Sequence, residues 1–191
     1  MQRLRLFLAL ELDSMIQECI SNATKSIRGQ TPNLRWVTKH NLHLTVRFLG
    51  QVPESKIPAL RTALSETFAT FCEFRLNFGA FGGFPTIQQC RVFWLGINGG
   101  NEECRNLKTM VDDALAPLGF PKEPKDFIPH VTLARAKREA VRIPSNFVET
   151  ASVITAEDNA VVIRELTLFK SELTPSGPIY TKVFGVQFQT R

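Results

Sequence analysis

Apolar and polar residues alternate along the chain in a way that predicts both strands and helices. Residues 4–12 are apolar enough for a central strand, and residues 73–81 place apolar side chains at every second position, as a half-buried strand does. Turn-forming residues interrupt the chain at residues 82–85, 98–101 and 174–178. Further strands are expected at residues 34–37, 90–97, 161–169 and 179–188.

Three segments carry apolar residues at helical spacing instead. The first begins at Asp13 or Ser14, either of which suits an N-cap, and the second follows Pro53. The third runs from about Glu102 to Leu118. Strands outnumber helices and in places follow one another directly, so we expect an α+β fold with mainly antiparallel sheets.

One short pattern occurs twice. Residues 42–49 read Leu-His-Leu-Thr-Val-Arg-Phe-Leu, and residues 129–135 read Pro-His-Val-Thr-Leu-Ala-Arg. Because successive side chains of a strand point to opposite faces, the His and Thr of each copy share one face: His43 with Thr45, and His130 with Thr132. An internal duplication, with two similar lobes that face each other, is the simplest explanation.

Two imidazoles on opposite sides of a phosphate can act as base and acid in one displacement. One takes a proton from the attacking water while the other protonates the departing oxygen, and the near-neutral pKa of histidine suits both roles. The threonine hydroxyls can donate hydrogen bonds to the phosphoryl oxygens. This chemistry requires no metal or cofactor, and the sequence contains no glycine-rich loop of the ATP-binding type. The alternative for each motif is a buried structural histidine with a hydrogen-bond partner.

The composition adds modest constraints. A chain of 191 residues with 43% hydrophobic and 21% charged residues fits one globular domain, or two small lobes that share a core. The net charge of +5 and the pI near 9.2 slightly favour an anionic partner. The 4 cysteines form no C-x-x-C pair, which suits reduced thiols in the cytoplasm. The N-terminal apolar run is too short to span a membrane, and no association stripe is evident, so we expect a monomer.

These motifs and their surroundings make the chain similar to the 2H phosphoesterase superfamily. Within it, the chain resembles the RNA 2′,3′-cyclic phosphodiesterases, also called 2′-5′ RNA ligases. The resemblance covers nearly the whole chain in the expected order. The segments that carry it are Arg5–Leu10, Asn41–Thr45, Phe48–Gly50, Phe81–Pro85, Val92–Gly96, Phe127–His130, Leu168–Leu173 and Gly177–Tyr180.

The resemblance implies one bilobal domain over residues 1–191, with two mainly antiparallel sheets facing a central cleft and helices outside. It also implies hydrolysis of an RNA 2′,3′-cyclic phosphate end to a 2′-phosphate, so that the 3′ oxygen departs. His43 would donate a proton to that oxygen and His130 would accept one from water. The two motifs are chemically alike and do not themselves distinguish these roles. Thr45 and Thr132 would hold the phosphate.

Two arginines follow the motifs and are candidates for phosphate binding. Arg47, at the fourth position after His43, shares the face of that histidine on an ideal strand, with a solvated rim position as the alternative. Arg135, at the fifth position after His130, completes a His-x-Thr-x-x-Arg run that resembles the family's second motif. An odd offset places it on the opposite face unless the strand bends or bulges.

Other residues have weaker claims to a function. His40 departs from the family, in which an acidic residue is frequent at this point, and we assign it no chemistry. Trp36 and Phe84 are candidates for stacking a base, with core packing as the alternative. A basic stretch is expected either to guide an RNA backbone or to be a solvated loop: Lys137, Arg138 and Arg142.

Two further functions stay open at this point. The same histidines, with acid and base exchanged, could join tRNA halves through a 2′-5′ linkage. The chain could instead be an RNA-binding module without turnover, although binding alone has no need of a paired acid and base.

Overall fold

The structure is a computed structural model that describes residues 2–144, 154, 160–175 and 177–190. Its strands are β1 (Arg3–Glu11), β2 (Leu34–Trp36), β3 (His43–Pro53), β4 (Phe74–Pro85), β5 (Cys90–Gly99), β6 (His130–Ala136), β7 (Val161–Ile163), β8 (Glu165–Thr174) and β9 (Gly177–Gln187). Its helices are α1 (Ser14–Ala23), α2 (Lys25–Gln30), α3 (Ile57–Thr67) and α4 (Asn101–Leu115), with short 3-10 turns η1 (Lys39–Asn41), η2 (Glu54–Lys56) and η3 (Ala116–Leu118).

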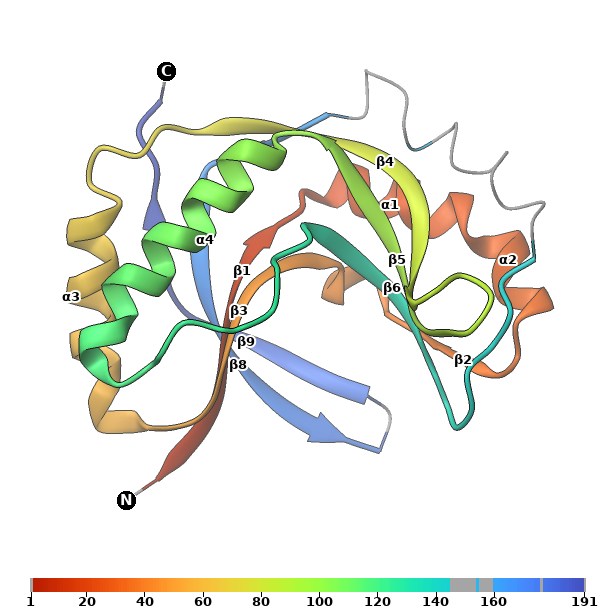
Figure 1. Ribbon diagram of the computed structural model, residues 1–191, viewed down its shortest axis with the longest axis horizontal. Helices are drawn as coiled ribbons and strands as arrows, with labels where there is room; N and C mark the ends of the chain where they lie inside the picture. Colours follow the sequence, from red (N-terminus) through yellow and green to blue (C-terminus); the bar gives the residue numbers. More distant parts are fainter. Residues whose placement is uncertain (1, 145–153, 155–159, 176, 191) are drawn as a thin grey trace.

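The strands form one curled antiparallel sheet in the order β7-β4-β5-β6-β3-β1-β8-β9, and β2 pairs with β6. We call β2 and β4 to β7 the β5 half-sheet, and β1, β3, β8 and β9 the β1 half-sheet. The halves meet where β3 and β6 share a single register pair, Leu44–Val131. Figure 1 shows α3 and α4 on the side of the β1 half-sheet, and α1 and α2 on the side of the β5 half-sheet. The predicted α+β fold is confirmed, and the two sheets that were expected are the two halves of a single sheet.

The helices begin and pack as their apolar spacing predicts. The carboxylate of Asp13 accepts a hydrogen bond from the backbone N–H of Ile16 at 2.8 Å, so Asp13 is the N-cap of α1. The hydroxyl of Thr24 donates to the carbonyl of Ile20 at 2.8 Å, at the point where α1 gives way to α2. Helices α3 and α4 contact each other and turn buried aliphatic residues to the core: Leu60, Leu64, Cys104, Leu107, Val111 and Leu115.

Two predicted boundaries are wrong for identifiable reasons. The segment 161–169 is not one strand, because β7 pairs with β4 whereas β8 pairs with β1, and the chain crosses between the half-sheets at Arg164. Strand β4 continues through residues 82–85, which the sequence predicts as a loop. There the Trp94 ring lies on the backbone of Gly82, where a Cβ atom would collide with it. Glycine in this strand therefore allows a close approach of the ring and does not mark a turn.

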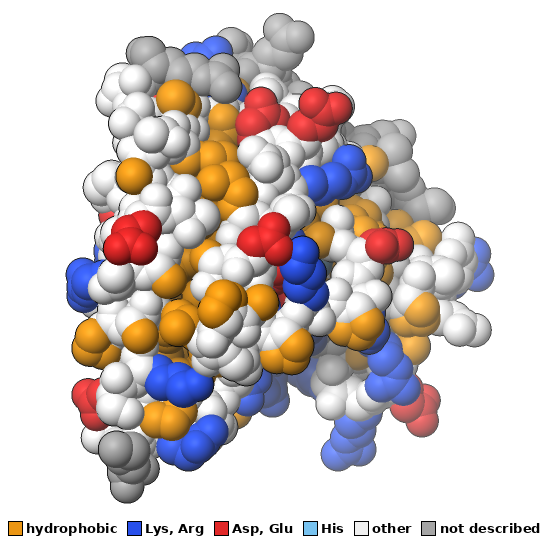
Figure 2. All heavy atoms as spheres, turned by 60° about the vertical axis from the view of Figure 1, so that its left-hand side comes forward, with side chains coloured by type: hydrophobic (Ala, Val, Ile, Leu, Met, Phe, Trp, Pro, Cys, Tyr) orange, Lys and Arg blue, Asp and Glu red, His pale blue; other side chains and the backbone are white. Residues whose placement is uncertain are grey.

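The outer surface over α3 and α4 shows no cluster of side chains of one charge (Figure 2). Figure 2 views this face, on which acidic and basic side chains are interspersed and no histidine is visible. None of the described helices is both long and apolar enough to cross a membrane.

Candidate active site

The two His-x-Thr motifs meet at the junction of the half-sheets. Leu44 and Val131, the middle residues of the motifs, are paired with each other and fully buried. Because the pairing is antiparallel and alternate side chains share a face, His43 is set against Thr132 and Thr45 against His130. The junction thus brings all four predicted polar residues to one side of the sheet, in an arrangement with approximate two-fold symmetry.

Each imidazole is held in the same way. The Nδ1 atom of His43 lies 2.8 Å from the carbonyl oxygen of Asn41, and the Nδ1 atom of His130 lies 2.7 Å from that of Ile128. A carbonyl oxygen only accepts hydrogen bonds, so Nδ1 carries the proton in each neutral ring. The Nε2 atom of each ring is then unprotonated and can accept a proton. In His43 this atom lies 3.0 Å from the hydroxyl oxygen of Thr45, which donates to it.

Aromatic side chains surround both rings. The ring of His43 lies 5.1 Å from that of Phe7 and meets the Tyr180 ring edge-on at 5.3 Å. The ring of His130 meets the Phe84 ring edge-on at 5.2 Å and lies 5.8 Å from Trp94. These walls limit the rotation of the imidazoles and remove part of their hydration.

The pKa of both histidines is lowered. Burial, together with the positive charges of Arg135 and His130, lowers the pKa of His43 from 6.5 to about 4, against the opposing hydrogen bond to Asn41. Burial and then Arg135 lower the pKa of His130, against its hydrogen bond to Ile128. Both rings are therefore neutral at neutral pH in the protein alone. A phosphate placed between them would favour the protonated forms, since an adjacent negative charge raises the pKa of a base.

A bulge in β6 turns Arg135 into the cleft. Phe93 pairs with Ala134 and Trp94 with Thr132, so Leu133 is an extra residue in the strand. Leu133 and Ala134 are consequently both buried, and Arg135 is exposed. Arg135 is the fifth residue after His130, and this bulge is the irregularity that lets it share the face of that histidine. The charge of Arg135 helps to lower the pKa of both histidines.

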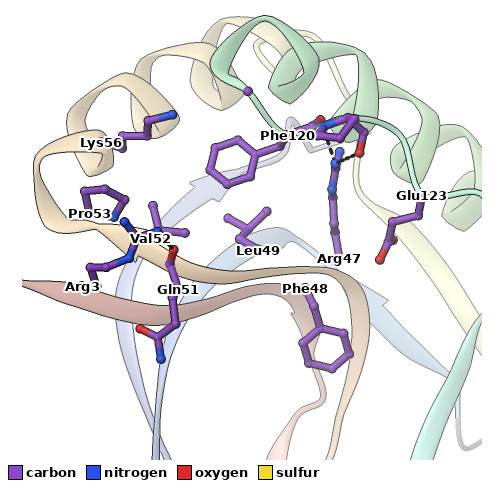
Figure 3. A pocket seen from close by; sticks show the side chains of 12 residues that line it. Arg3, Arg47, Phe48, Leu49, Gln51, Val52, Pro53, Lys56, Phe120 and Glu123 are labelled. Carbon is purple, nitrogen blue, oxygen red and sulfur yellow. Dashed lines mark hydrogen bonds between the residues drawn. The ribbon is translucent and has the colours of Figure 1, made fainter.

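A matching bulge in β3 turns Arg47 away, and the prediction that Arg47 shares the face of His43 is wrong. Thr45 pairs with Ala9 and Arg47 with Leu8, so Val46 is the extra residue. Arg47 is only 3% exposed, whereas Phe48 is 53% exposed. Figure 3 shows these two side chains leaving opposite faces of β3.

One buried carboxylate and two backbone carbonyls occupy the guanidinium of Arg47. Nη1 lies 2.6 Å from a carboxylate oxygen of Asp112, and Nη2 donates to the carbonyls of Phe120 at 2.8 Å and Pro121 at 2.6 Å. The other carboxylate oxygen of Asp112 accepts from Lys108 at 2.5 Å. Arg47 therefore fastens the segment after α4, which leads to His130, onto β3.

The cleft contains two pockets, and Phe48 lines both of them. The aromatic pocket, of about 740 Å³, is lined by Thr45, by His130 and by the apolar groups of Phe48, Phe84, Phe127 and Ile128. Its lining also includes five charged residues: Arg47, Lys108, Glu123, Lys125 and Asp126. The arginine pocket, of about 560 Å³, is lined by Arg5, Arg35, Arg135, Phe7, Phe48 and Tyr180, among others. Phe84 thus lies in the cleft, although it also packs against Trp94 at 5.2 Å.

The other aromatic and basic candidates lie elsewhere. Trp36 packs against Phe93 at 5.8 Å and donates from Nε1 to the Thr31 hydroxyl at 3.3 Å, which is the core-packing alternative. Lys137 and Arg138 line a separate surface pocket, Arg142 is exposed, and His40 is exposed in η1. None of these five residues lines either pocket of the cleft.

Several residues of the cleft were not predicted to have a functional role. Phe7, Phe169 and Tyr180 come from β1, β8 and β9, and only the sheet order β3-β1-β8-β9 brings them to His43. Their one sequence signal was their presence in segments that carry the family resemblance. Among the described residues, no group of three His, Cys, Asp or Glu side chains is placed to hold a metal ion.

Fold and site together define a phosphoesterase-like cleft with two equivalent histidines, and comparison with known proteins identifies the family. A family model described as the 2′-5′ RNA ligase superfamily matches residues 16–173. This chain belongs to that superfamily, and the resemblance to the 2H phosphoesterases is confirmed.

Similar proteins come from archaea and bacteria. The RNA 2′,3′-cyclic phosphodiesterase of Archaeoglobus fulgidus is 35% identical over 177 residues, covering 93% of this chain and 96% of the relative. The protein of the same name from Methanothermobacter thermautotrophicus is 31% identical, with 94% and 96% covered. The crystal structure of E. coli LigT with 3′-AMP has a TM-score of 0.79 at 27% identity and covers 98% of this chain and 99% of LigT.

Proposed function

We propose that this chain hydrolyses the 2′,3′-cyclic phosphate at the end of an RNA strand to a 2′-phosphate. The observation that carries this proposal is the pair of imidazoles, each fixed through Nδ1 by the carbonyl two residues earlier, on strands that adjoin at Leu44–Val131. The names of the relatives indicate the same reaction.

In the proposed mechanism, water attacks the phosphorus and the bond to the 3′ oxygen breaks. Nε2 of His130 accepts the proton of the water, and Nε2 of His43, protonated beforehand, gives its proton to the 3′ oxygen. The low pKa of His43 in the free protein means that the donor acquires its proton with the substrate, because the phosphate charge stabilises the imidazolium. Each such proton transfer contributes about 10²–10⁴-fold to the rate.

Three further residues hold the phosphate in this proposal. The hydroxyls of Thr45 and Thr132 donate to non-bridging oxygens, and Arg135 balances their charge from β6. Arg47 is not a ligand in this scheme, because its donors are directed to Asp112, Phe120 and Pro121. It instead positions the segment that leads to His130.

The proposed catalyst is the single chain. Both histidines come from one copy, and residues 1–191 are inferred to act as one bilobal domain, as a monomer in the cytoplasm. No metal or cofactor takes part in the proposed steps. Excess EDTA is therefore expected to leave the rate unchanged, and a loss of activity that added metal restores would contradict this claim.

The test uses His43→Ala and His130→Ala, with His40→Ala as the matched control. An RNA oligonucleotide with a 2′,3′-cyclic phosphate is incubated with each variant, and the phosphate end of the product is identified. We expect a 2′-phosphate from the parent and from His40→Ala, and a loss of at least about 100-fold in each cleft variant. Parent-like rates from both cleft variants would exclude the two-histidine mechanism. If RNA with a 5′-hydroxyl end is added and a 2′-5′ joined product dominates, ligation is the main reaction, and tRNA halves are then the candidate substrates.

A further inference from the structure

The arginine pocket has a charge that the proposed acid–base chemistry does not use. Arg5, Arg35 and Arg135 line it, and none of its other described lining residues is acidic. Within the described part of the chain, no side chain or carbonyl forms an ion pair or hydrogen bond with these three guanidinium groups. Three positive charges therefore line one pocket that has no counter-charge among the described residues.

The backbone places two of these charges in direct opposition. Arg35 on β2 is the register partner of Arg135 on β6, and both side chains are exposed. Like charges at directly opposed positions of a sheet destabilise it. An anion shared by the two arginines would remove this repulsion, since planar guanidinium groups bind phosphate oxygens in pairs.

The pocket adjoins the reacting groups. Phe7 and Tyr180 both line it, and their rings lie 5.1 Å and 5.3 Å from the ring of His43. Arg35 lies one strand further out, and neighbouring strands are about 4.8 Å apart. The pocket is thus suited to a phosphate next to the reacting one and not to the reacting phosphate itself.

We propose that Arg5 and Arg35 bind the phosphodiester on the 5′ side of the terminal nucleotide, so that the chain selects RNA ends over 2′,3′-cyclic mononucleotides. This inference rests on the proposed hydrolysis of cyclic phosphates. The terminal base then lies in the aromatic pocket on the other side of Phe48, where stacking is tolerant of base identity.

The test compares three substrates that end in the same adenosine 2′,3′-cyclic phosphate: the mononucleotide, a dinucleotide, and a dinucleotide with a neutral methylphosphonate linkage. They are hydrolysed at fixed salt by the parent, Arg5→Gln, Arg35→Gln and Arg35→Lys. Arg105→Gln, which alters an exposed arginine of α4, is the control. Thermal unfolding of each variant shows whether it is folded.

For the parent we expect kcat/KM to be at least about tenfold higher for the dinucleotide than for the mononucleotide, the factor for one charge-assisted contact. The methylphosphonate should lose this preference. Arg5→Gln and Arg35→Gln should each reduce the dinucleotide-to-mononucleotide ratio by about tenfold, Arg35→Lys by less, and Arg105→Gln not at all.

Three outcomes would overturn the inference. The first is a parent that shows no preference for the dinucleotide, and the second is a preference that persists with the methylphosphonate linkage. The third is an Arg35→Gln variant whose kcat/KM falls equally for the mononucleotide and for the phosphodiester dinucleotide. Failure of the proposed function itself looks different, because the parent then hydrolyses none of the three substrates.

Discussion

Arg47 and Arg135 follow equivalent histidines, and substituting each by methionine should produce opposite kinds of defect. Arg47→Met retains much of the apolar stem but removes the ion pair with Asp112 and the hydrogen bonds to the carbonyls of Phe120 and Pro121. Arg135→Met removes a charge that is exposed and has no ion-pair partner among the described residues. The first change should destabilise the fold, and the second should impair the reaction.

The loss of stability expected for Arg47→Met follows from the groups that lose their partner: the carboxylate of Asp112 and the carbonyls of Phe120 and Pro121. Removing one partner of a buried ion pair costs about 3–5 kcal/mol. The lower end applies here, because Asp112 keeps Lys108 as a partner at 2.5 Å and because a pocket beside Phe120 and Pro121 admits water to their carbonyls. For a chain of this length, about 3 kcal/mol corresponds to a fall in Tm of roughly 6–12 °C.

For Arg135→Met the stability should change by no more than about 0.5 kcal/mol, as for other exposed positions. Loss of charge-assisted hydrogen bonds to phosphate should reduce kcat/KM by about 10–100-fold. The assays are thermal unfolding followed by circular dichroism, and hydrolysis of a cyclic-phosphate oligonucleotide well below the Tm of each variant. The reasoning is refuted if Arg47→Met unfolds at the parental temperature yet loses as much activity as Arg135→Met.

Two further predictions concern the histidines. The pKa of His43 is about 4 in the folded protein and 6.5 when unperturbed. Between these pH values only the unfolded chain binds the proton, so the free energy of unfolding should fall by up to about 3 kcal/mol as the pH drops from 6.5 to 4. Denaturant unfolding at several pH values should show that His43→Gln flattens this dependence and that His40→Gln does not; equal slopes in all three proteins would disprove it. Second, because Arg135 lowers the pKa of both histidines, Arg135→Gln should raise both pKa values in an NMR titration, and no change in either would mean that its charge lies elsewhere.

Much of the fold follows from periodic patterns that local sequence carries. The Asp13 cap and the apolar stripes of α3 and α4 depend on nearby residues and are found where expected. The alternation in β4 holds from Phe74 to Phe78 but not at Ala80, which is exposed. The break at Arg164 is different, since it reflects a choice of partner: β4 for one side and β1 for the other. Such a choice depends on partner strands that are far away in the sequence, and it leaves no local signal.

The candidate site divides in the same way. The shared face of His43 with Thr45, and of His130 with Thr132, follows from the two-residue repeat of a strand. The walls around His43 do not, because Phe7 and Tyr180 reach it only through sheet pairing. The pKa values follow even less from the sequence, since they depend on burial and on the position of Arg135.

The two bulges explain how a duplicated framework can receive an asymmetric substrate. Each inserts one extra residue directly after the threonine, at Val46 and at Leu133, so both copies reverse their faces at the same place. The fourth position after each histidine then turns to the core and the fifth to the cleft. The copies differ in side-chain character at these two positions, because Arg47 and Phe48 in one copy correspond to Ala134 and Arg135 in the other, whereas the earlier apolar positions stay apolar.

One copy consequently presents an aromatic ring to the cleft and the other a guanidinium. The symmetric part of the site, two imidazoles and two hydroxyls, suits a phosphate with an entering and a leaving oxygen on opposite sides. The asymmetric part suits a nucleotide, in which a base extends from one side of the ribose and a charged backbone from the other. On this argument Phe48 and Arg135 set the direction in which the strand enters. Exchanging the residues Phe48 and Arg135 should therefore disturb the orientation of the substrate more than it disturbs the hydrogen bonds that hold His43 and His130. The bulges, and not the repeated motif itself, make a single direction of entry possible.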